Sequence, residues 1–484
     1  MAIGFGINGS TTDHGGLVTS TQSRSSQNNN LFLRAGDGFL CPKCRCWSTL
    51  IKSNDLVIFE GKAVAYVGDK FTCGATLLPK QSHVVGDAGG GGSQLIPLSN
   101  SLINDDSNLV DQSLYSKITL RSVVSGKFVP LGVVSFDGKP SKSELVFTFT
   151  IKKGKFDKII LEVEQNGNYI EVQKIEKLFK VGEVQNIKWD GFIKDTYNSN
   201  FMTNPKGVKF RIKGFLSGVE KAIDKKGFIF KYFDKDWMDV IINKRTNSII
   251  INLRVNLQDG GDVGLKSGNG VPINVINQQN PPIQPLTSRN QTFNQLKKLA
   301  IDGMNYYWSR NNNHPTGKNV LINGKAFQVS VNTMHSNLMS LPAMPLIFTT
   351  NWIPSRSCNW EISRVTYYIT GYVKFQSFSS STWEYWNKKI SDQRFKHTFA
   401  HEMGHELLLA YGGQIYSKKH KGSSTLFTQT AMEGTTYPRT GEIDLMKYAD
   451  ENSRSSRISQ FSERSVAAME DVLGLIYISG IQQK

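Results

Sequence analysis

The sequence predicts a multidomain protein with a small Gly-rich β domain at residues 1–95, a central β-sandwich at 112–258 and a C-terminal α+β domain at 290–484. Three observations predict this division. The length of 484 residues suits about three domains of roughly 150 residues each. Two stretches rich in Gly, Asn and Pro separate the blocks. Hydrophobic residues make up 39% of the chain and charged residues 20%, so most of it can form cores.

Charge and hydropathy exclude several classes of protein. The net charge of +17, from 57 Lys and Arg against 40 Asp and Glu, favours an anionic partner. The positive residues are spread along the chain without a dense run among aromatics, so we expect no nucleic-acid binding. Since no run of about 18 apolar residues occurs, we expect no integral membrane segment. The start lacks a basic segment followed by an apolar run, so we expect synthesis in the cytoplasm without a signal peptide.

The N-terminal and central blocks are rich in strand-like runs. Residues 57–59 and 63–67 flank a Glu-Gly-Lys turn, which predicts a hairpin. Residues 89–93 are Gly-Gly-Gly-Gly-Ser, which is typical of a flexible linker. In the central block, β-branched and aromatic runs recur between turn residues, which favours a β-sandwich. We expect its strands at 117–124, 145–151, 158–164, 208–212 and 248–255. Residues 259–290 have the composition of a second linker.

The C-terminal block mixes both periodicities. Helical spacing predicts helices over 293–308, 383–390, 395–410 and, at the end, 458–476. The pair Gly412-Gly413 is expected to end the third of these helices. Short apolar runs predict strands at 320–322, 327–331 and 345–348.

One motif in this block carries chemistry. His401-Glu402-Met403-Gly404-His405 lies within the helix expected over 395–410. Positions i and i+4 share one helix face, so His401 and His405 can present two imidazole nitrogens to one Zn²⁺ ion. Glu402 lies one residue further round the helix, where it can accept a proton from the water that the metal activates. We therefore predict a zinc-dependent hydrolase of amide bonds with Glu402 as catalytic residue.

The third ligand is less well defined by the pattern. We expect Glu442, because a carboxylate from a second helix completes the ligand set in gluzincins. The alternates are His420 and Asp444, and Glu433 is a further candidate. If His420 is not a ligand, it suits a catalytic role as a donor to the oxyanion. If Asp444 is not a ligand, it suits a helix N-cap or a partner of a ligating histidine.

The N-terminal block contains a second group of possible ligands. Cys41 and Cys44 form a C-x₂-C pair, Cys46 follows, and Cys73 and His14 stand further away. This spacing predicts a structural zinc site, which would supply folding energy to a domain with little core. The alternative is a set of free thiols.

This block resembles the PAAR-repeat family over about residues 1–90. The resemblance rests on Gly36-Asp37-Gly38, Cys41-Pro42-Lys43-Cys44, the run 61–65, Gly68-Asp69 and Thr72-Cys73-Gly74-Ala75. It implies a β-cone on the trimeric valine-glycine-repeat spike protein of type VI secretion systems, with zinc near the tip. The implied ligands are His14, Cys41, Cys44 and Cys73. Members commonly have His where Cys44 stands, and Cys46 is an additional thiol.

The C-terminal block is similar to zincin-type metallopeptidase effectors, on the residues 401–405, 411–413, 420–423 and 441–444. The central run 187–192 resembles immunoglobulin-like modules, which would serve as a spacer or adaptor. Together these resemblances imply an antibacterial toxin that the type VI system secretes into a target cell and that a cognate immunity protein neutralises in the producer.

The expected substrate is a periplasmic protein or a peptidoglycan peptide, with the periplasm as the site of action. Two alternatives stay open: a spike-tip adaptor without catalysis, and a toxin that acts on another substrate such as DNA or a membrane. The spread of positive charge and the lack of amphipathic apolar spans argue against the latter.

Overall fold

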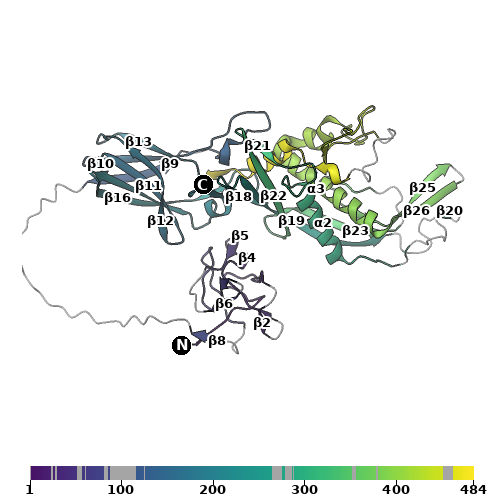
Figure 1. Ribbon diagram of the computed structural model, residues 1–484, viewed down its shortest axis with the longest axis horizontal. Helices are drawn as coiled ribbons and strands as arrows, with labels where there is room; N and C mark the ends of the chain where they lie inside the picture. The colour runs from purple at the N-terminus through teal and green to yellow at the C-terminus, as the bar shows by residue number, and fades with distance from the viewer. Residues whose placement is uncertain are drawn as a thin grey trace, which may run out of the picture.

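The computed structural model describes residues 2–22, 25–27, 30–51, 57–59, 61–80, 85–87, 116–124, 126–263, 275–277, 286, 288–350, 356–377, 380–450 and 462–484. This part of the chain is multidomain and mostly β, with few helices (Figure 1). The predicted linker at 89–93 lies outside the described residues.

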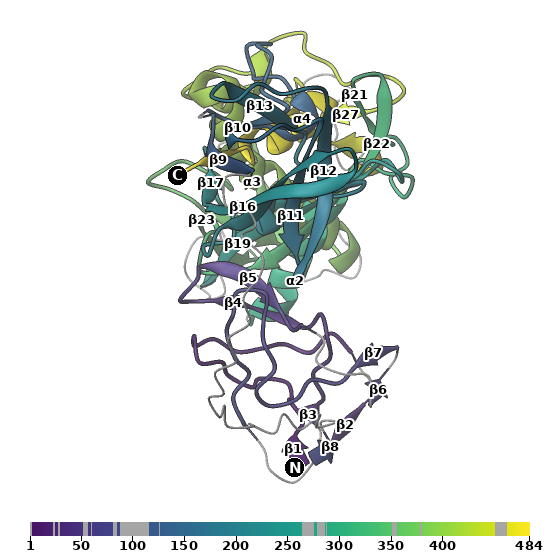
Figure 2. The same cartoon turned by 90° about the vertical axis from the view of Figure 1, so that its left-hand side faces the viewer.

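The N-terminal domain consists of very short strands joined by turns. They are β1 (Ala2–Gly4), β2 (Ser26–Gln27), β3 (Asn30–Leu31), β4 (Gly38–Cys41), β5 (Cys46–Thr49), β6 (Ile58–Phe59), β7 (Lys62–Ala63) and β8 (Val85–Asp87). The predicted hairpin is confirmed, because β6 pairs with β7 in antiparallel register. Figure 2 shows these strands grouped together in one small body. Two small clusters of buried apolar side chains form the core, one around Leu33 and Phe39 and the other around Phe5 and Tyr66.

Two antiparallel sheets make up most of the central region. The first has the order β13-β10-β9, and the second the order β12-β11-β15-β16. Buried aromatic rings in mutual contact form the core: Phe147, Trp189, Phe210 and Phe228. The strands are β9 (Lys117–Val123), β10 (Leu145–Lys153), β11 (Lys158–Gln165), β12 (Asn168–Glu176), β13 (Val184–Trp189), β15 (Val208–Leu216) and β16 (Val219–Phe228).

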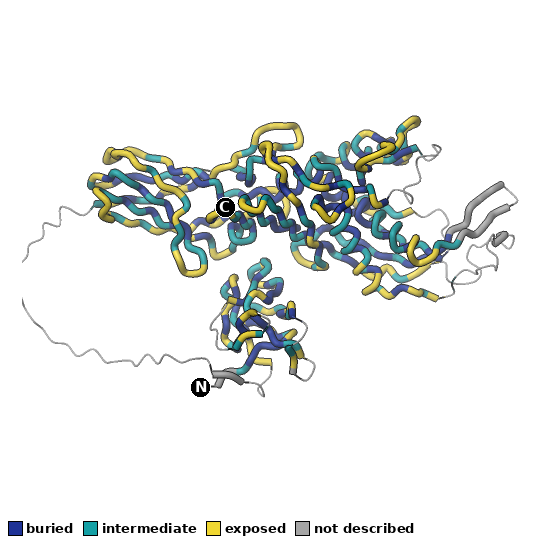
Figure 3. Tube along the Cα trace, viewed as in Figure 1, coloured by how far each residue is buried: buried dark blue, intermediate teal, exposed yellow. Residues whose placement is uncertain are grey.

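A third sheet joins the central and C-terminal regions. Its long strand β19 (Ser248–Val263) pairs antiparallel with β18 (Met238–Asn243) and parallel with β22 (Lys325–His335) and β23 (Leu341–Thr349). The remaining strands are β14 (Thr196–Asn198), β21 (Val320–Ile322) and β24 (Thr366–Ile369). One hydrophobic core extends from Ile118 to Ile481. Figure 3 shows buried chain running from the central sheets into the C-terminal region.

The boundary predicted at 259–290 therefore does not separate two cores. The strand β19 continues to Val263, inside the stretch predicted as a linker, because its second half pairs with β23. Within the same stretch, β20 (Val275–Asn277) pairs with β26 (Ser380–Tyr385). The chain also returns from its C-terminal side, where β29 (Ile481–Gln483) pairs with β17 (Phe230–Tyr232).

The longer helices lie beside the third sheet (Figure 1). They are α2 (Phe293–Tyr307), α3 (Lys388–Lys418) and α4 (Met469–Ile478), while α1 (Ser199–Met202) is a single turn. A capping box between Thr292 and Gln295 begins α2. Gly303 lets α2 approach α3 closely, since a Cβ there would lie 2.4 Å from the backbone oxygen of Lys396. None of the described helices combines the length and apolar composition needed to cross a membrane.

Three predicted helix positions need correction. The helix predicted over 383–390 is correct only at its end: residues 383–385 belong to β26, which pairs with β25 (Gly371–Ser377), and α3 begins after its N-cap, Asn387. The glycine pair interrupts α3 as predicted, since Gly413 takes a non-helical φ of 79° and ψ of −179°, but a second helical segment then runs on to Lys418. The terminal helix begins at Met469, after a short 3₁₀ turn at 462–464 and β28 (Ser465–Val466). Residues 458–461 of that prediction lie outside the described residues.

Candidate metal centres

The central part of α3 is buried on all sides, so a polar residue there needs a structural or functional reason. Every residue from Phe399 to Leu408 is buried. The side chains of two neighbouring segments donate hydrogen bonds to its backbone: Trp308 Nε1 to Ala400 O at 3.1 Å and Asn359 Nδ2 to Glu402 O at 2.6 Å. Histidine and glutamate at such positions require partners or a function, because burying them without one is costly.

Three histidines meet beside this helix. His401 and His405 share one face of α3, as predicted, and His420 comes from the short turn of residues 420–422 that follows the helix. The ring centroids form a nearly equilateral triangle with sides of 5.0, 5.1 and 4.8 Å. One nitrogen of each ring lies within 4.8 Å of the others, and all three residues are buried.

The outer nitrogen of each ring is already engaged. The Nδ1 atoms of His401, His405 and His420 lie 2.8, 3.2 and 2.7 Å from Leu445 O, Ser417 Oγ and Ser424 Oγ. Each of the two hydroxyls donates its own proton to a backbone oxygen, and Leu445 O can only accept. The hydrogen-bond network therefore assigns the proton of all three rings to Nδ1 and leaves a lone pair on Nε2.

The inner nitrogens have the properties of metal ligands. The Nε2 atoms of His401 and His420 are buried without a hydrogen-bond partner among the described residues. Burial lowers the pKa of His401, that of His405 further, and that of His420 to about 2, so the three rings are neutral. Neutral imidazoles, oriented by outer hydrogen bonds with their lone pairs toward one point, are the donor set that zinc prefers.

A turn at residues 444–448 completes the surroundings, and the sequence pattern did not reveal it. Leu445 O holds His401, and Met446 packs against Gly404, where a Cβ would lie 2.4 Å from its sulfur. The ring of Tyr448 stacks on His420 with 3.6 Å between centroids. The sequence analysis selected the acidic residue Asp444 of this segment as a candidate ligand. The contacts with the histidines are made instead by Leu445 and Tyr448.

Glu402 lies next to His401 with its side chain almost fully buried. Burial raises the pKa of its carboxyl group to about 8, although the charges of Arg356 and Lys418 act in the opposite direction. Among the described residues, no ion pair is formed by this carboxyl group. A carboxyl group with a pKa near neutrality can both accept and release a proton, which fits the predicted catalytic role.

The carboxylates predicted as third ligand lie elsewhere. Glu442 Oε1 accepts a hydrogen bond from Arg310 Nη2 at 2.6 Å, and its side chain is 39% exposed. Asp444 lies 2.7 Å from the ammonium group of Lys421, and Glu433 is exposed. The third residue of the cluster is His420, the alternate, so the set is three imidazoles and not the gluzincin set. The role at the oxyanion was predicted only for a His420 that is not a ligand and stays a prediction: its Nδ1 lies 2.7 Å from Ser424 Oγ, and its Nε2 has no hydrogen-bond partner among the described residues.

The position of His420 depends on a left-handed turn. His420, Lys421 and Gly422 have φ values of 48°, 56° and 86°, a conformation that costs free energy for the first two residues. Lys421 compensates, since its ammonium group lies 2.7, 2.8 and 2.9 Å from Asp444, Glu470 and Asp471. Burial opposes its charge, but Asp471 and Asp444 together hold the pKa of Lys421 above the ordinary value.

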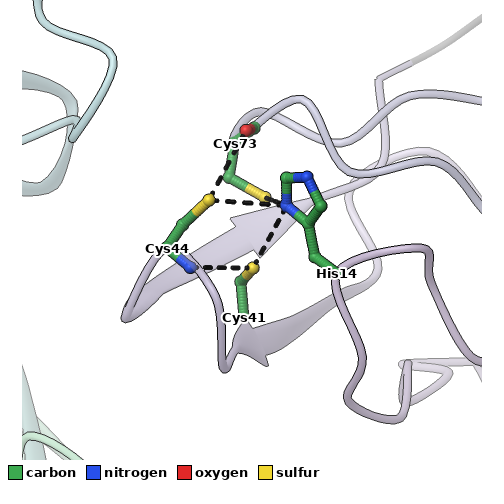
Figure 4. Close-up of side chains that lie close together, drawn as sticks. All are labelled: His14, Cys41, Cys44 and Cys73. Carbon is green, nitrogen blue, oxygen red and sulfur yellow. Dashed lines mark hydrogen bonds between the residues drawn. The ribbon is translucent and has the colours of Figure 1, made fainter.

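The second cluster lies in the N-terminal domain (Figure 4). His14 Nδ1 lies 3.6, 3.4 and 4.0 Å from the sulfurs of Cys41, Cys44 and Cys73. A tetrahedral ion with bonds of about 2.3 Å to sulfur and about 2.1 Å to nitrogen requires roughly 3.6 Å between those atoms. The four residues predicted for the structural site thus have the spacing of a zinc site.

Turns of the small domain bring these ligands together. Cys41 ends β4, and Cys44 lies in the turn to β5, where its N–H approaches the Cys41 sulfur to 3.4 Å. Gly16, near His14, has φ 82°, and a Cβ there would lie 2.7 Å from the ring of Phe39. This position therefore requires glycine.

Cys46 is a neighbour of the cluster. A hydrogen bond from its thiol is the main cause that lowers the pKa of Cys73 to about 4, whereas burial raises that of Cys44 to about 12. Several buried thiols cannot all ionise without a cation, and a divalent metal supplies the missing positive charge.

Fold and site define the N-terminal region as a zinc-binding β domain built from turns and very short strands. A family model for the PAAR motif matches residues 8–79, which include all four ligands. The match supports a PAAR-type spike-tip domain of the type VI secretion system for this N-terminal region. A search of curated proteins finds no match to the chain.

Proposed function

We propose that this spike-tip protein is an antibacterial toxin whose C-terminal region is a zincin-like metallopeptidase. The observation that carries the proposal is the cluster of His401, His405 and His420, with its inward lone pairs and with Glu402 beside it. In this proposal the two central sheets are an immunoglobulin-like spacer, although they share their core with the toxin region.

Each residue of the cluster has its own role in the proposed reaction. The three histidines would hold zinc, which when bound lowers the pKa of water from about 15.7 towards about 7 and polarises a carbonyl group. Glu402 takes the proton of the attacking water and gives it to the nitrogen of the leaving amine. Its pKa of about 8 suits both transfers. Tyr448, half-buried, stacks on His420 and helps to fix the orientation of that ring.

The proposed substrates are peptidoglycan peptides or periplasmic proteins of the target cell. The net charge of +17 favours association with anionic murein. A toxin of this kind requires a cognate immunity protein in the producer, which would cover the histidine cluster or its entrance.

The test compares the full chain with Glu402→Gln. We expect the variant to retain zinc and its fold but to lose hydrolysis of periplasmic proteins or peptidoglycan peptides by about 10²- to 10⁴-fold. Toxicity after export to the periplasm of a target cell should be lost with it. Glu361→Gln, an exposed acid of the same region, is the matched control and should remain toxic.

Two results would refute the proposal in different ways. Full toxicity of Glu402→Gln would remove the catalytic assignment. A wild-type chain that binds zinc at His401, His405 and His420 but neither hydrolyses these substrates nor kills would instead indicate a spike-tip adaptor.

A further inference from the structure

The kink in α3 leaves a short helical segment that other side chains must hold in place. Gly413 is not helical, so residues 414–418 do not simply continue the buried part of the helix. A helix of this length is not stable by itself. The segment nevertheless carries Ser417, whose hydroxyl lies 3.2 Å from His405 Nδ1, and it leads directly to His420. Its orientation therefore determines how two of the three imidazole rings are placed.

Phe136 bridges the two parts of the kinked helix. It lies in the loop between β9 and β10, in the central region of the chain. The centroid of its ring is 5.4 Å from that of Tyr411, before the kink, and 4.5 Å from that of Tyr416, after it. A Cβ at Gly412 would lie 2.8 Å from the Phe136 ring and 2.4 Å from the Tyr416 ring. The two rings thus close over the glycine backbone, and one side chain contacts both parts of α3.

The loop that carries Phe136 has its own anchors. Ser135 N–H donates to Lys139 O at 3.0 Å, which closes the turn around the phenylalanine. Asn323 Nδ2, from the turn between β21 and β22, donates to Leu131 O at 2.9 Å. The Phe136 side chain is 46% exposed and so contributes little to the central core. The position of this ring is therefore set by the loop, and its packing partners are the tyrosines of α3.

Tyr416 connects Phe136 with the histidines in two directions. Along the chain, the next residue is Ser417, whose hydroxyl holds the His405 ring. Across the fold, the Tyr416 phenol donates to Asp471 Oδ1 at 2.7 Å. The other oxygen of Asp471 lies 2.9 Å from the ammonium group of Lys421, the residue that follows His420. A shift of the Tyr416 ring would therefore move the supports of both imidazoles.

We propose that Phe136 is a positioning residue of the histidine cluster. From the central sheets, it fixes the orientation of residues 414–422 and, through it, the directions of the His405 and His420 lone pairs. The central region is then a structural part of the metal site and more than a spacer. The inference rests on the proposed function as far as the metal is concerned, whereas the ring contacts exist without it.

Hydrogen exchange measured by mass spectrometry tests the structural step. The full chain is given one equivalent of zinc, which the thiolate-rich N-terminal site takes first. We expect the amides of residues 414–422 to exchange about 10-fold faster in Phe136→Ala, with those of 399–408 unchanged. Phe233→Ala is the matched control, since this ring is 47% exposed and lies against Lys127. It should exchange as the wild type does.

Metal binding tests the step from the helix to the cluster. Competition with a chromophoric chelator should show that Phe136→Ala lowers the zinc affinity of the C-terminal site by about 10-fold, the lower end for changes outside the ligand set. The affinity of the N-terminal site should not change. Cobalt(II), added after one equivalent of zinc, should give an altered absorption spectrum in this variant, because the ligand geometry differs. Phe136→Tyr keeps the ring and should restore the wild-type affinity and spectrum.

The outcomes separate this inference from the proposed function. Wild-type zinc affinity and cobalt spectrum in Phe136→Ala overturn the positioning role, even if residues 414–422 exchange faster, and leave the zinc site standing. Equal effects in Phe233→Ala also overturn it, because the loss would then be a general destabilisation. A wild-type chain that takes up no second metal ion refutes the C-terminal site and the inference with it.

Discussion

The two candidate metal clusters of this chain differ in how much structure surrounds them. In the N-terminal domain, Cys41 and Cys73 belong both to the ligand set and to the hydrophobic core, which contains few large side chains. In the C-terminal region, two of the three histidines lie on the buried helix α3, which is part of a hydrophobic core that extends from Ile118 to Ile481. The comparison teaches that a metal bound at the first cluster would replace a core, whereas one bound at the second would use a core that already exists.

The sharpest test of this difference is to separate the regions. We expect residues 290–484 alone not to fold, because β22 and β23 lose their parallel partner β19. The apolar side chains that faced β19 would be exposed to water. Residues 112–484 should give a cooperative unfolding transition and bind zinc. A folded, zinc-binding 290–484 fragment would show that the third sheet is dispensable.

The second test removes a thiolate. Cys41→Ala should unfold the N-terminal domain, because structural zinc contributes about 10 kcal/mol or more to domains of this kind. Limited proteolysis and zinc analysis of the full chain should show loss of one zinc and cleavage within residues 1–79, with the C-terminal region intact. Cys358→Ala, which lies outside both clusters, should retain full zinc content. Unchanged protease resistance of Cys41→Ala would contradict the folding role of the metal.

The third test concerns the turn that presents His420. Lys421→Met removes the only positive charge that the described structure places beside buried Asp471, so we expect a loss of about 3–5 kcal/mol in the free energy of unfolding. Urea unfolding of the full chain measures it in the C-terminal transition. Lys447→Met, at an exposed position, should change it by less than about 0.5 kcal/mol. A loss below about 1 kcal/mol for Lys421→Met would show that the ion pairs do not hold the turn.

The smallest effect on folding is expected for a histidine ligand. His420→Ala should lower the zinc affinity of the C-terminal site by more than about 100-fold, which is the upper end for substitutions that do not remove a ligand. The stability of the metal-free chain should change little. Glu442→Ala should leave the zinc affinity unchanged, because Glu442 pairs with Arg310. Zinc titration against a chromophoric chelator measures both, and the opposite ranking would restore Glu442 as ligand.

Local patterns predicted the parts of the site that lie on one element. The spacing of His401 and His405 within a helical pattern was sufficient to place both rings on one face, and the C-x₂-C pair predicted the N-terminal site. Several central strands also follow from alternation, as the agreement at 145–151 and 158–164 with β10 and β11 illustrates.

Features that depend on distant residues were not predictable in this way. Arg310 neutralises Glu442 across 132 residues, so the sequence near Glu442 gave no sign that it was already paired. The glycine pair suggested a helix end, but a kink at Gly413 lets α3 continue and deliver His420. The first part of the helix predicted over 383–390, residues 383–385, is strand, because β25 and β20 both pair with β26.

The parallel pairing of β19 with β22 and β23 also determines the order in which folding and metal binding occur. Parallel pairs between distant segments form slowly, because a long loop must close before any contact is gained. The outer hydrogen bond of His401 reaches Leu445, 44 residues along the chain, so the three rings converge only after the sheet and the turn at 444–448 are in place. We therefore expect metal uptake to follow folding at the C-terminal cluster and to accompany it at the N-terminal one.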